Sequence, residues 1–256
     1  MIRLIGPGGA GKSSTGSLLA ERLGARFVDL DERFGATVGD ISEHIGSHGY
    51  GAYAARNVRV YADVVRGAAG EEWVLALSSG FMTYPEDIHP AYARFRRHIA
   101  ASPTTFVLLP SLDLETCVAE TVRRQLGRPF SRSAECEEQV IRARFALYRG
   151  LPVTTIETMR PVAEVVEAVA AIVAAQRGAA PDGGPAFFSA PEVGEPRTPE
   201  PSPFGGSGSA HTGVREAIED GLADSAASRT TPVEEVRRRF GLDPASDLPP
   251  DPEPVE

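Results

Sequence analysis

The first 180 residues alternate between short, continuous apolar runs and longer stretches in which apolar residues recur with helical spacing. A strand that is buried on both faces carries no polar alternation, so each short run predicts a strand of a parallel sheet. These runs are residues 2–5, 25–30, 73–77, 105–109 and 153–156. Because the runs alternate with helical stretches, we expect an α/β domain of three layers with right-handed crossovers.

The intervening stretches place apolar residues three or four positions apart, as one face of a helix requires. The expected helices are residues 13–23, 41–69, 114–126, 135–148 and 161–175. Gly24 would end the first helix, and Gly46, Gly49 and Gly51 would break the second. Residues 127–133 are polar and include a proline, which predicts a loop.

The pattern stops near residue 180, where the composition changes. Of the 21 prolines, 13 lie from Pro181 onward, and that stretch has a net charge of −9, whereas residues 1–180 are neutral on balance. A segment rich in Pro, Gly, Ser and acidic residues buries too little apolar area to order itself. We therefore expect a folded domain, 1–178, and a largely disordered tail, 179–256, with short helices near 214–222 and 232–240.

Charge and hydropathy exclude several classes of function. A neutral domain has no basic surplus of the kind that nucleic-acid binding requires, so we expect no nucleic acid partner. No stretch approaches about 18 consecutive apolar residues, so we expect no membrane span. The N-terminus lacks a basic segment followed by an apolar run, which argues against a signal peptide. We expect a cytoplasmic, monomeric protein that acts on a small molecule.

A phosphate-binding loop follows the first strand, because Gly6-Pro7-Gly8-Gly9-Ala10-Gly11-Lys12-Ser13 matches the P-loop pattern G-x-x-x-x-G-K-[ST]. Such a loop turns backbone N–H groups toward the phosphates at a helix N-terminus, whose dipole also favours anions. Lys12, the only lysine of the chain, would reach the β and γ phosphates, and the Ser13 hydroxyl would ligate Mg²⁺. We expect ATP and Mg²⁺ as cofactors, with the loop contributing Gly8, Gly9, Ala10, Gly11, Lys12, Ser13 and Ser14.

A P-loop alone does not separate a kinase from a GTPase or a motor ATPase. The small domain favours a metabolite kinase, and residues 2 to about 173 resemble the shikimate kinase family. The resemblance rests on the P-loop, the triplet Asp29-Leu30-Asp31, the strand-then-glycine segment 74–80, the pair Arg128-Pro129, and Arg144 followed by Leu147-Tyr148. It implies a five-stranded parallel sheet in the order 2-3-1-4-5, and ATP-dependent phosphorylation of a small-molecule hydroxyl with shikimate as the first candidate.

The resemblance also implies roles for single side chains. Asp29 would hold an Mg²⁺-bound water beside Ser13, and Asp31 would bind the acceptor hydroxyls and take up the proton. Arg128 would close over the transferred phosphoryl group, and Arg144 would pair with a substrate carboxylate. These roles agree with the chemistry, because phosphoryl transfer needs charge neutralisation and arginine binds carboxylates with a bidentate fork.

Plainer alternatives stand beside three of these assignments. Asp31 could cap a helix N-terminus, and Arg128 could be a solvated loop residue. Arg123 and Arg124 are candidates for stacking on the adenine, but either could equally be a charge on a helix surface.

The acceptor side departs from the family pattern in two places. Shikimate kinases carry an arginine after an aromatic residue in the long helical region, where this chain has Ala54 after Tyr53. Arg56 is a poor substitute, because two further residues turn a helix by about 200°. The family's triple glycine reads Ser78-Ser79-Gly80, which adds side chains near the substrate. The acceptor therefore need not be shikimate, and the expected acceptor-site residues are Asp31, Arg56, Ser79, Gly80 and Arg144.

Residues 213–242 of the tail resemble the toxin-binding C-terminal segments of bacterial antitoxins. Their apolar residues have helical spacing but no partner surface within a disordered tail, as in segments that fold on binding. This favours a second hypothesis of another class, an ATP-binding regulatory module that has lost acceptor chemistry and binds a protein partner through its tail. The plainer alternative is an acidic tail without a partner.

Overall fold

The computed structural model describes residues 1–178 of the chain, apart from residue 69, residues 127–133 and the side chains of Leu126 and Cys136. The expected loop residue Arg128 and the whole tail, with its short helices and its partner segment, lie outside the described residues. Within the described part of the chain, no helix is long and apolar enough to cross a membrane.

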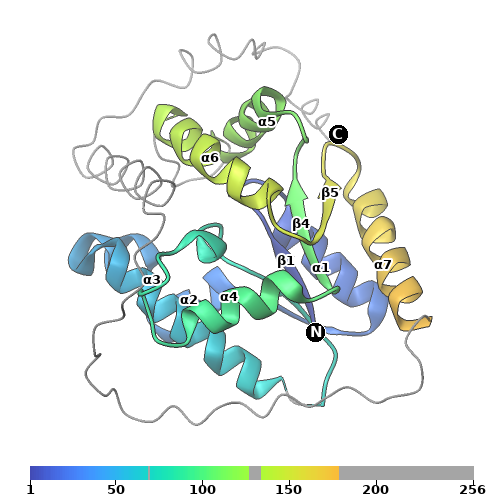
Figure 1. Ribbon diagram of the computed structural model, residues 1–256, viewed down its shortest axis with the longest axis horizontal. Helices are drawn as coiled ribbons and strands as arrows, with labels where there is room; N and C mark the ends of the chain where they lie inside the picture. Colours follow the sequence, from blue (N-terminus) through green and yellow to red (C-terminus); the bar gives the residue numbers. More distant parts are fainter. Residues whose placement is uncertain (69, 127–133, 179–256) are drawn as a thin grey trace, which may run out of the picture.

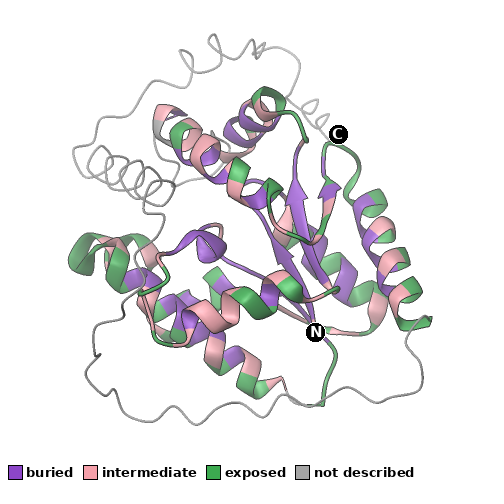
Figure 2. Ribbon diagram, viewed as in Figure 1, coloured by how far each residue is buried: buried purple, intermediate pink, exposed green. Residues whose placement is uncertain are grey.

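Five parallel strands form one sheet in the order β2-β3-β1-β4-β5, which confirms the expected topology. The strands are β1 (Ile2–Ile5), β2 (Arg26–Asp29), β3 (Trp73–Ala76), β4 (Thr105–Leu109) and β5 (Thr154–Glu157). The three central strands β1, β3 and β4 are buried along their whole length, as their continuous apolar sequences predict. Figure 2 shows this buried centre with the exposed residues on the outer sides of the helices.

Helices cover both faces of the sheet (Figure 1). They are α1 (Lys12–Leu23), α2 (Leu30–Thr37), α3 (Ile41–Gly67), α4 (Tyr92–Ala101), α5 (Leu114–Leu126), α6 (Ala134–Arg149) and α7 (Val162–Gly178), with a short 3₁₀ helix, η1 (Phe81–Thr83). Neighbouring residues of a strand point to opposite faces. Leu4 accordingly packs with Leu19 of α1 and Val169 of α7, whereas Ile5 packs with Phe34 of α2 and Val58 of α3.

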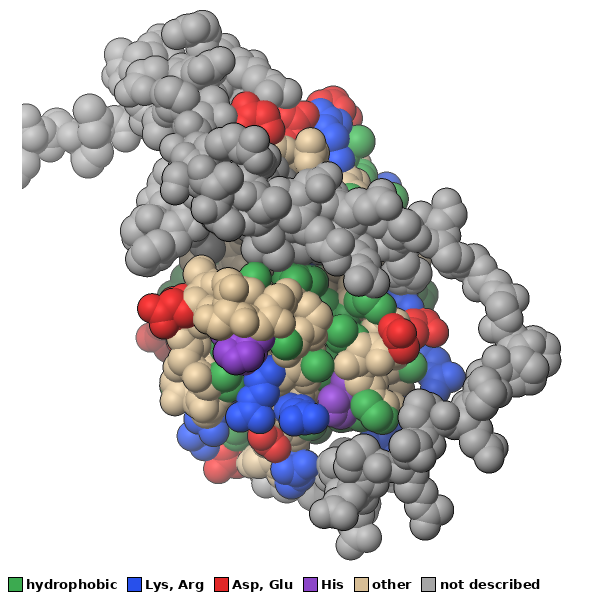
Figure 3. All heavy atoms as spheres, turned by 90° about the vertical axis from the view of Figure 1, so that its left-hand side faces the viewer, with side chains coloured by type: hydrophobic (Ala, Val, Ile, Leu, Met, Phe, Trp, Pro, Cys, Tyr) green, Lys and Arg blue, Asp and Glu red, His purple; other side chains and the backbone are tan. Residues whose placement is uncertain are grey.

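Helices α5 and α6 pack on each other through a small cluster that includes Val118, Val122 and Ile141. In Figure 1 they lie at the top of the view, on the side toward which β4 and β5 point. This is the carboxyl edge of the sheet, where open α/β folds bind their ligands. On the face that Figure 3 presents, the visible side chains mix basic, acidic, histidine and apolar types.

Three short elements, α2, α4 and η1, were not expected from the sequence. The breaks expected at Gly46 and Gly51 are wrong, because α3 continues through both and departs from helical geometry only at Gly49 (φ 81°, ψ 163°). A glycine inside a helix costs only about 1 kcal/mol. Packing of the buried face of α3, including Tyr53, Val58 and Tyr61, can offset such a cost.

Candidate functional site

The P-loop joins the end of β1 to the start of α1, and its glycines are required by backbone conformation and, at Gly6 and Gly9, by close packing. Gly6 (φ 145°), Gly9 (φ 72°) and Gly11 (φ 87°) have positive φ angles. A Cβ atom on Gly6 would collide with the carbonyl oxygen of Leu108, and one on Gly9 would lie 3.2 Å from that of Thr121. Since no side chain caps the N-terminus of α1, its N–H groups remain available to an anion.

Lys12 and Ser13 stand at the start of α1 with partners that suit a bound triphosphate. The Lys12 ammonium donates to the carbonyl oxygens of Gly6 (2.9 Å) and Pro7 (2.8 Å), which holds it over the loop. The Ser13 hydroxyl donates to Asp29 Oδ2 at 2.5 Å. A hydroxyl and a carboxylate side by side supply the oxygen ligands that Mg²⁺ prefers, so these residues fit the metal.

Asp29 is fixed by the helix that follows it. Its Oδ1 atom accepts the backbone N–H groups of Asp31 (2.9 Å) and Glu32 (3.4 Å), which makes Asp29 the N-cap of α2. The capping role that was an alternative for Asp31 therefore belongs to Asp29. Asp31 lies in the first turn of α2 with an exposed side chain.

A cavity of about 320 Å³ adjoins the P-loop. Its lining residues are Gly9, Gly11, Ser14, Thr15, Arg124, Thr158, Arg160, Val162 and Val165. Ser14 and Arg124 were expected at the nucleotide, whereas Thr158 and Arg160 were not, because the turn after β5 carries no recognisable motif. The size and the position of the cavity suit the base and the sugar of a nucleotide.

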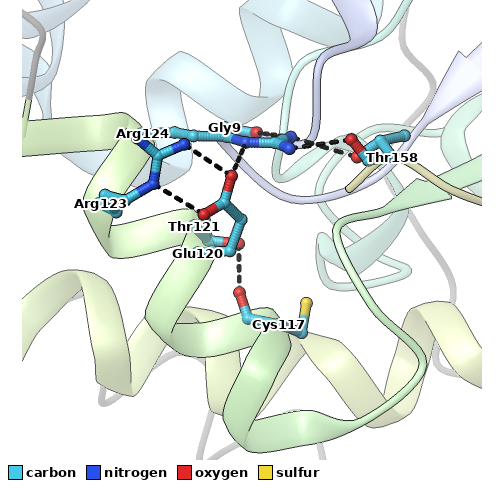
Figure 4. A network of polar contacts seen from close by, with 7 residues as sticks. All are labelled: Gly9, Cys117, Glu120, Thr121, Arg123, Arg124 and Thr158. Atoms are coloured by element: carbon cyan, nitrogen blue, oxygen red, sulfur yellow. Dashed lines mark hydrogen bonds and ion pairs between the residues drawn. The ribbon is translucent and has the colours of Figure 1, made fainter. Parts of the chain in front are cut away.

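Arg124 is braced in the wall of this cavity (Figure 4). Its Nη1 atom donates to the Gly9 carbonyl (3.1 Å) and Thr158 Oγ1 (3.2 Å), and its Nη2 atom donates to the Thr158 carbonyl (2.9 Å). The carboxylate of Glu120 accepts a hydrogen bond from Arg124 Nε at 2.6 Å and another from Arg123 Nε at 2.8 Å. Hydrogen bonds from Arg123, and next from Arg124, hold the pKa of Glu120 below its ordinary value. Arg124 is thus a fixed part of the site rather than a solvated surface charge.

Arg144 of α6, an expected acceptor-site residue, is a buried cation. Only 4% of Arg144 is exposed, and its Nη1 and Nη2 atoms donate to Ser79 Oγ (3.4 Å) and to the Tyr50 hydroxyl (3.2 Å). Its Nε atom is buried without a hydrogen-bond partner. In the described part of the chain, no carboxylate forms an ion pair with Arg144. A buried charge without a counterion is costly, which is the condition expected of a site for an anionic ligand.

Two tyrosines, Tyr148 and Tyr53, feel the charge of Asp31, the residue expected to take up the proton. The Tyr148 hydroxyl donates to the carbonyl oxygen of Ser79 at 2.7 Å. Burial raises the pKa of Tyr148, Arg144 opposes that rise, and the negative charge of Asp31 adds to it. Burial, and next the charge of Asp31, likewise raises the pKa of Tyr53. Asp31 therefore lies within electrostatic reach of both phenols, which stay neutral at physiological pH.

Asn57 is a buried polar residue of this region that the sequence reasoning missed. Its Nδ2 atom donates to Ser78 Oγ (2.8 Å), to the Tyr84 hydroxyl (2.9 Å) and to the Tyr53 hydroxyl (3.4 Å), while its Oδ1 atom has no partner. The available signal was an amide four residues after Tyr53, on the same face of the helix.

The structure brings the expected residues Ser79, Gly80 and Arg144 together. A Cβ atom on Gly80 would collide with the Tyr50 hydroxyl and lie 3.0 Å from Arg144 Nη2. Arg56, by contrast, is exposed on α3, while Asn57 beside it is buried. Among the described residues, no hydrogen bond or ion pair joins Arg56 to the other expected acceptor residues.

Comparison with known proteins identifies the family. A family model of shikimate kinase matches residues 8–174. The shikimate kinase of Methylococcus capsulatus is 32% identical over 164 residues, which cover 61% of this chain and 82% of that protein. Among solved structures, the shikimate kinase from Acinetobacter baumannii in complex with shikimate has a TM-score of 0.53 and 26% identity, covering 69% of this chain and 93% of its own. The enzyme from Aquifex aeolicus has a TM-score of 0.51 at 19% identity, which shows the fold alone. This chain belongs to the shikimate kinase family and is an ATP-dependent small-molecule kinase of that type.

Proposed function

We propose that the chain transfers the γ-phosphoryl group of ATP to a hydroxyl of a small anionic metabolite, with shikimate as the first candidate. The observation that carries the proposal is the buried guanidinium of Arg144, which has no carboxylate partner among the described residues. An acceptor carboxylate would supply the missing counterion. The solved relative from Acinetobacter baumannii, which is in complex with shikimate, supports the choice of candidate.

The nucleotide is held by the P-loop and by the cavity beside it. Lys12 would turn from its carbonyl partners to the β and γ phosphates, where it neutralises charge that develops in the transition state. Ser13 and Asp29 would hold Mg²⁺, which when bound neutralises phosphate charge and orients the triphosphate. Arg124, fixed by Thr158 and Glu120, would border the adenine.

The acceptor would lie between Arg144 and Asp31. Its hydroxyl oxygen forms a bond to the γ-phosphorus while the bond from that phosphorus to the bridging oxygen of ADP breaks, and the hydroxyl proton passes to Asp31. The electrostatic reach of Asp31 to Tyr148, whose hydroxyl binds Ser79, supports this placement. Arg128, outside the described residues, would cover the phosphoryl group in transit.

A coupled assay of ADP release tests the proposal directly. Purified protein with ATP and Mg²⁺ is offered shikimate, other cyclic and acyclic hydroxy acids, and uncharged polyols. We expect ADP release that depends on an acceptor with a carboxylate. Release that is equal with and without every acceptor would refute the proposal. Preference for uncharged polyols would refute the assignment of Arg144.

The alternative of an ATP-binding module without acceptor chemistry is not favoured. The family assignment covers the catalytic domain, and the described site retains Lys12, Asp31 and an acceptor-side cation. A protein partner for residues 213–242 stays a separate proposal, because that segment lies outside the described residues.

A further inference from the structure

Tyr50 brings a hydroxyl group to the buried guanidinium of Arg144. Its oxygen accepts a hydrogen bond from Arg144 Nη2 at 3.2 Å, although the two residues are 94 positions apart in the chain. The same oxygen occupies the space in which Gly80 would carry a Cβ atom. Tyr50 is half-buried, and its ring packs against those of Tyr53 and Tyr84. Tyr50 thus lies in the acceptor site at the group that we assign to the substrate anion.

The position of Tyr50 is set by the backbone break just before it. Gly49 has φ 81° and ψ 163°, in the region that L side chains rarely adopt. The helix resumes at Tyr50, so the break determines the direction in which the ring enters the site. Since nothing lies within 4 Å of a Cβ atom built on Gly49, its conformation rather than its surroundings requires glycine there.

The buried face of α3 adds no second positive charge to this region. Ala54 lies four residues after Tyr50, on the same side of the helix, and is fully buried. The polar groups that follow are the Tyr53 hydroxyl and the amide of Asn57. Burial raises the pKa of Tyr53 and of Tyr84, so both stay neutral. On the side of α3, Arg144 therefore meets only neutral hydrogen-bonding groups among the described residues.

We propose that Tyr50 is a specificity-determining residue whose hydroxyl is the second hydrogen-bonding group for the acceptor anion held by Arg144. The inference rests on the proposed function and narrows its substrate class to hydroxy acids with one carboxylate. A hydroxyl accepts from the guanidinium and can also donate to a carboxylate oxygen. A phosphorylated or dicarboxylic acceptor would bring a second charge that the described groups around Arg144 do not neutralise.

The test compares Tyr50→Phe with Tyr61→Phe, using shikimate as the probe. Tyr61 is the matched control because it lies on the same helix, is buried, and is not part of the site. Its hydroxyl likewise accepts a hydrogen bond from an arginine, from Arg3 Nε at 3.1 Å. We expect Tyr50→Phe to raise the KM for shikimate about 10-fold, as for a lost hydrogen bond to a charged group. The KM for ATP and kcat should stay within about 2-fold, and Tyr61→Phe should change none of the three constants.

The methyl ester of shikimate isolates the anionic group, because it keeps the ring hydroxyls and loses the charge. If Tyr50 serves the carboxylate, Tyr50→Phe raises the KM of the acid and not that of the ester. Gly49→Ala should reproduce the effect on the acid, since it strains the break that orients Tyr50. An unchanged KM for the acid in Tyr50→Phe, or an equal loss for acid and ester, overturns the inference.

Two further outcomes separate this inference from the proposed function. If the unsubstituted protein neither binds nor phosphorylates shikimate or any other hydroxy acid, the proposed function itself fails. If it phosphorylates them and Tyr50→Phe behaves like Tyr61→Phe, only the role of Tyr50 fails. A higher kcat/KM for a phosphorylated or dicarboxylic hydroxy acid than for shikimate contradicts the inferred single charge.

Discussion

The nucleotide side and the acceptor side of this site are built in different ways. The nucleotide side is largely backbone, formed by consecutive residues of the P-loop at the start of α1, whose glycines are fixed by contacts with β4 and α5. The proposed acceptor side consists of buried and half-buried polar side chains from α3, α6 and the segment after β3, together with the exposed Asp31 of α2. A contiguous loop can be recognised from sequence and serves any acceptor, whereas a set of distant side chains can change with the substrate.

Lys12→Ala should have the largest effect, because it removes the only cation of the P-loop. We expect a loss in kcat of at least about 100-fold, as for other charge-stabilising groups of preorganised sites. The melting temperature should change little, since the ammonium that donates to the loop carbonyls of Gly6 and Pro7 is only partly buried. If Lys12→Ala kept more than a few per cent of kcat, the assignment of the P-loop as the nucleotide site would be contradicted.

Arg144→Ala tests the acceptor side alone. Loss of a buried charge partner should cost about 2–5 kcal/mol of acceptor binding, which raises the KM for the acid by roughly 30-fold or more, with the KM for ATP unchanged. Arg142→Ala is the matched control, because Arg142 lies on the same helix but pairs with Glu115 and Glu138 at the surface. Equal effects of the two substitutions would remove Arg144 from the acceptor site.

Asp29→Asn sharpens the comparison on the nucleotide side. Asparagine keeps the N-cap of α2, so the substitution removes mainly the charge beside Ser13. We expect the concentration of Mg²⁺ needed for half-maximal rate to rise about 10-fold. Asp113→Asn, at a capping aspartate at the start of α5, should leave it unchanged. An unchanged Mg²⁺ requirement in Asp29→Asn would show that Asp29 serves only as a cap.

Truncation after Ala180 should have the smallest effect. The described residues end with α7, which packs on one face of the sheet beside α1 through residues such as Val169 and Val173. We expect the melting temperature to change by less than about 2 °C and the kinase constants to stay unchanged. A truncated protein that unfolds or loses activity would contradict the domain boundary at residue 178.

The sequence predicted the two sides unequally. Local patterns predicted the five strands, the α/β class and the P-loop. The family resemblance predicted Ser79, Gly80 and Arg144 as acceptor-site residues, which lie together in the structure. Tyr50 and Asn57 were missed as site residues, because aromatic and amide side chains on a helix do not reveal from sequence which distant groups they meet. The helix α2 was missed as an element because its N-cap, Asp29, was assigned to the metal alone and the capping alternative was placed at Asp31.

Transfer of labelled phosphate from [γ-³²P]ATP tests the central claim most directly, because it separates a kinase from a nucleotide hydrolase. The purified protein is incubated with Mg²⁺, labelled ATP and shikimate, and the label is followed in phosphorylated shikimate and in free phosphate. The account predicts label in the acid, produced in step with ADP and lost in Lys12→Ala. Label that appears only as free phosphate, or ATP that binds and is not consumed with shikimate or any other hydroxy acid, would contradict it.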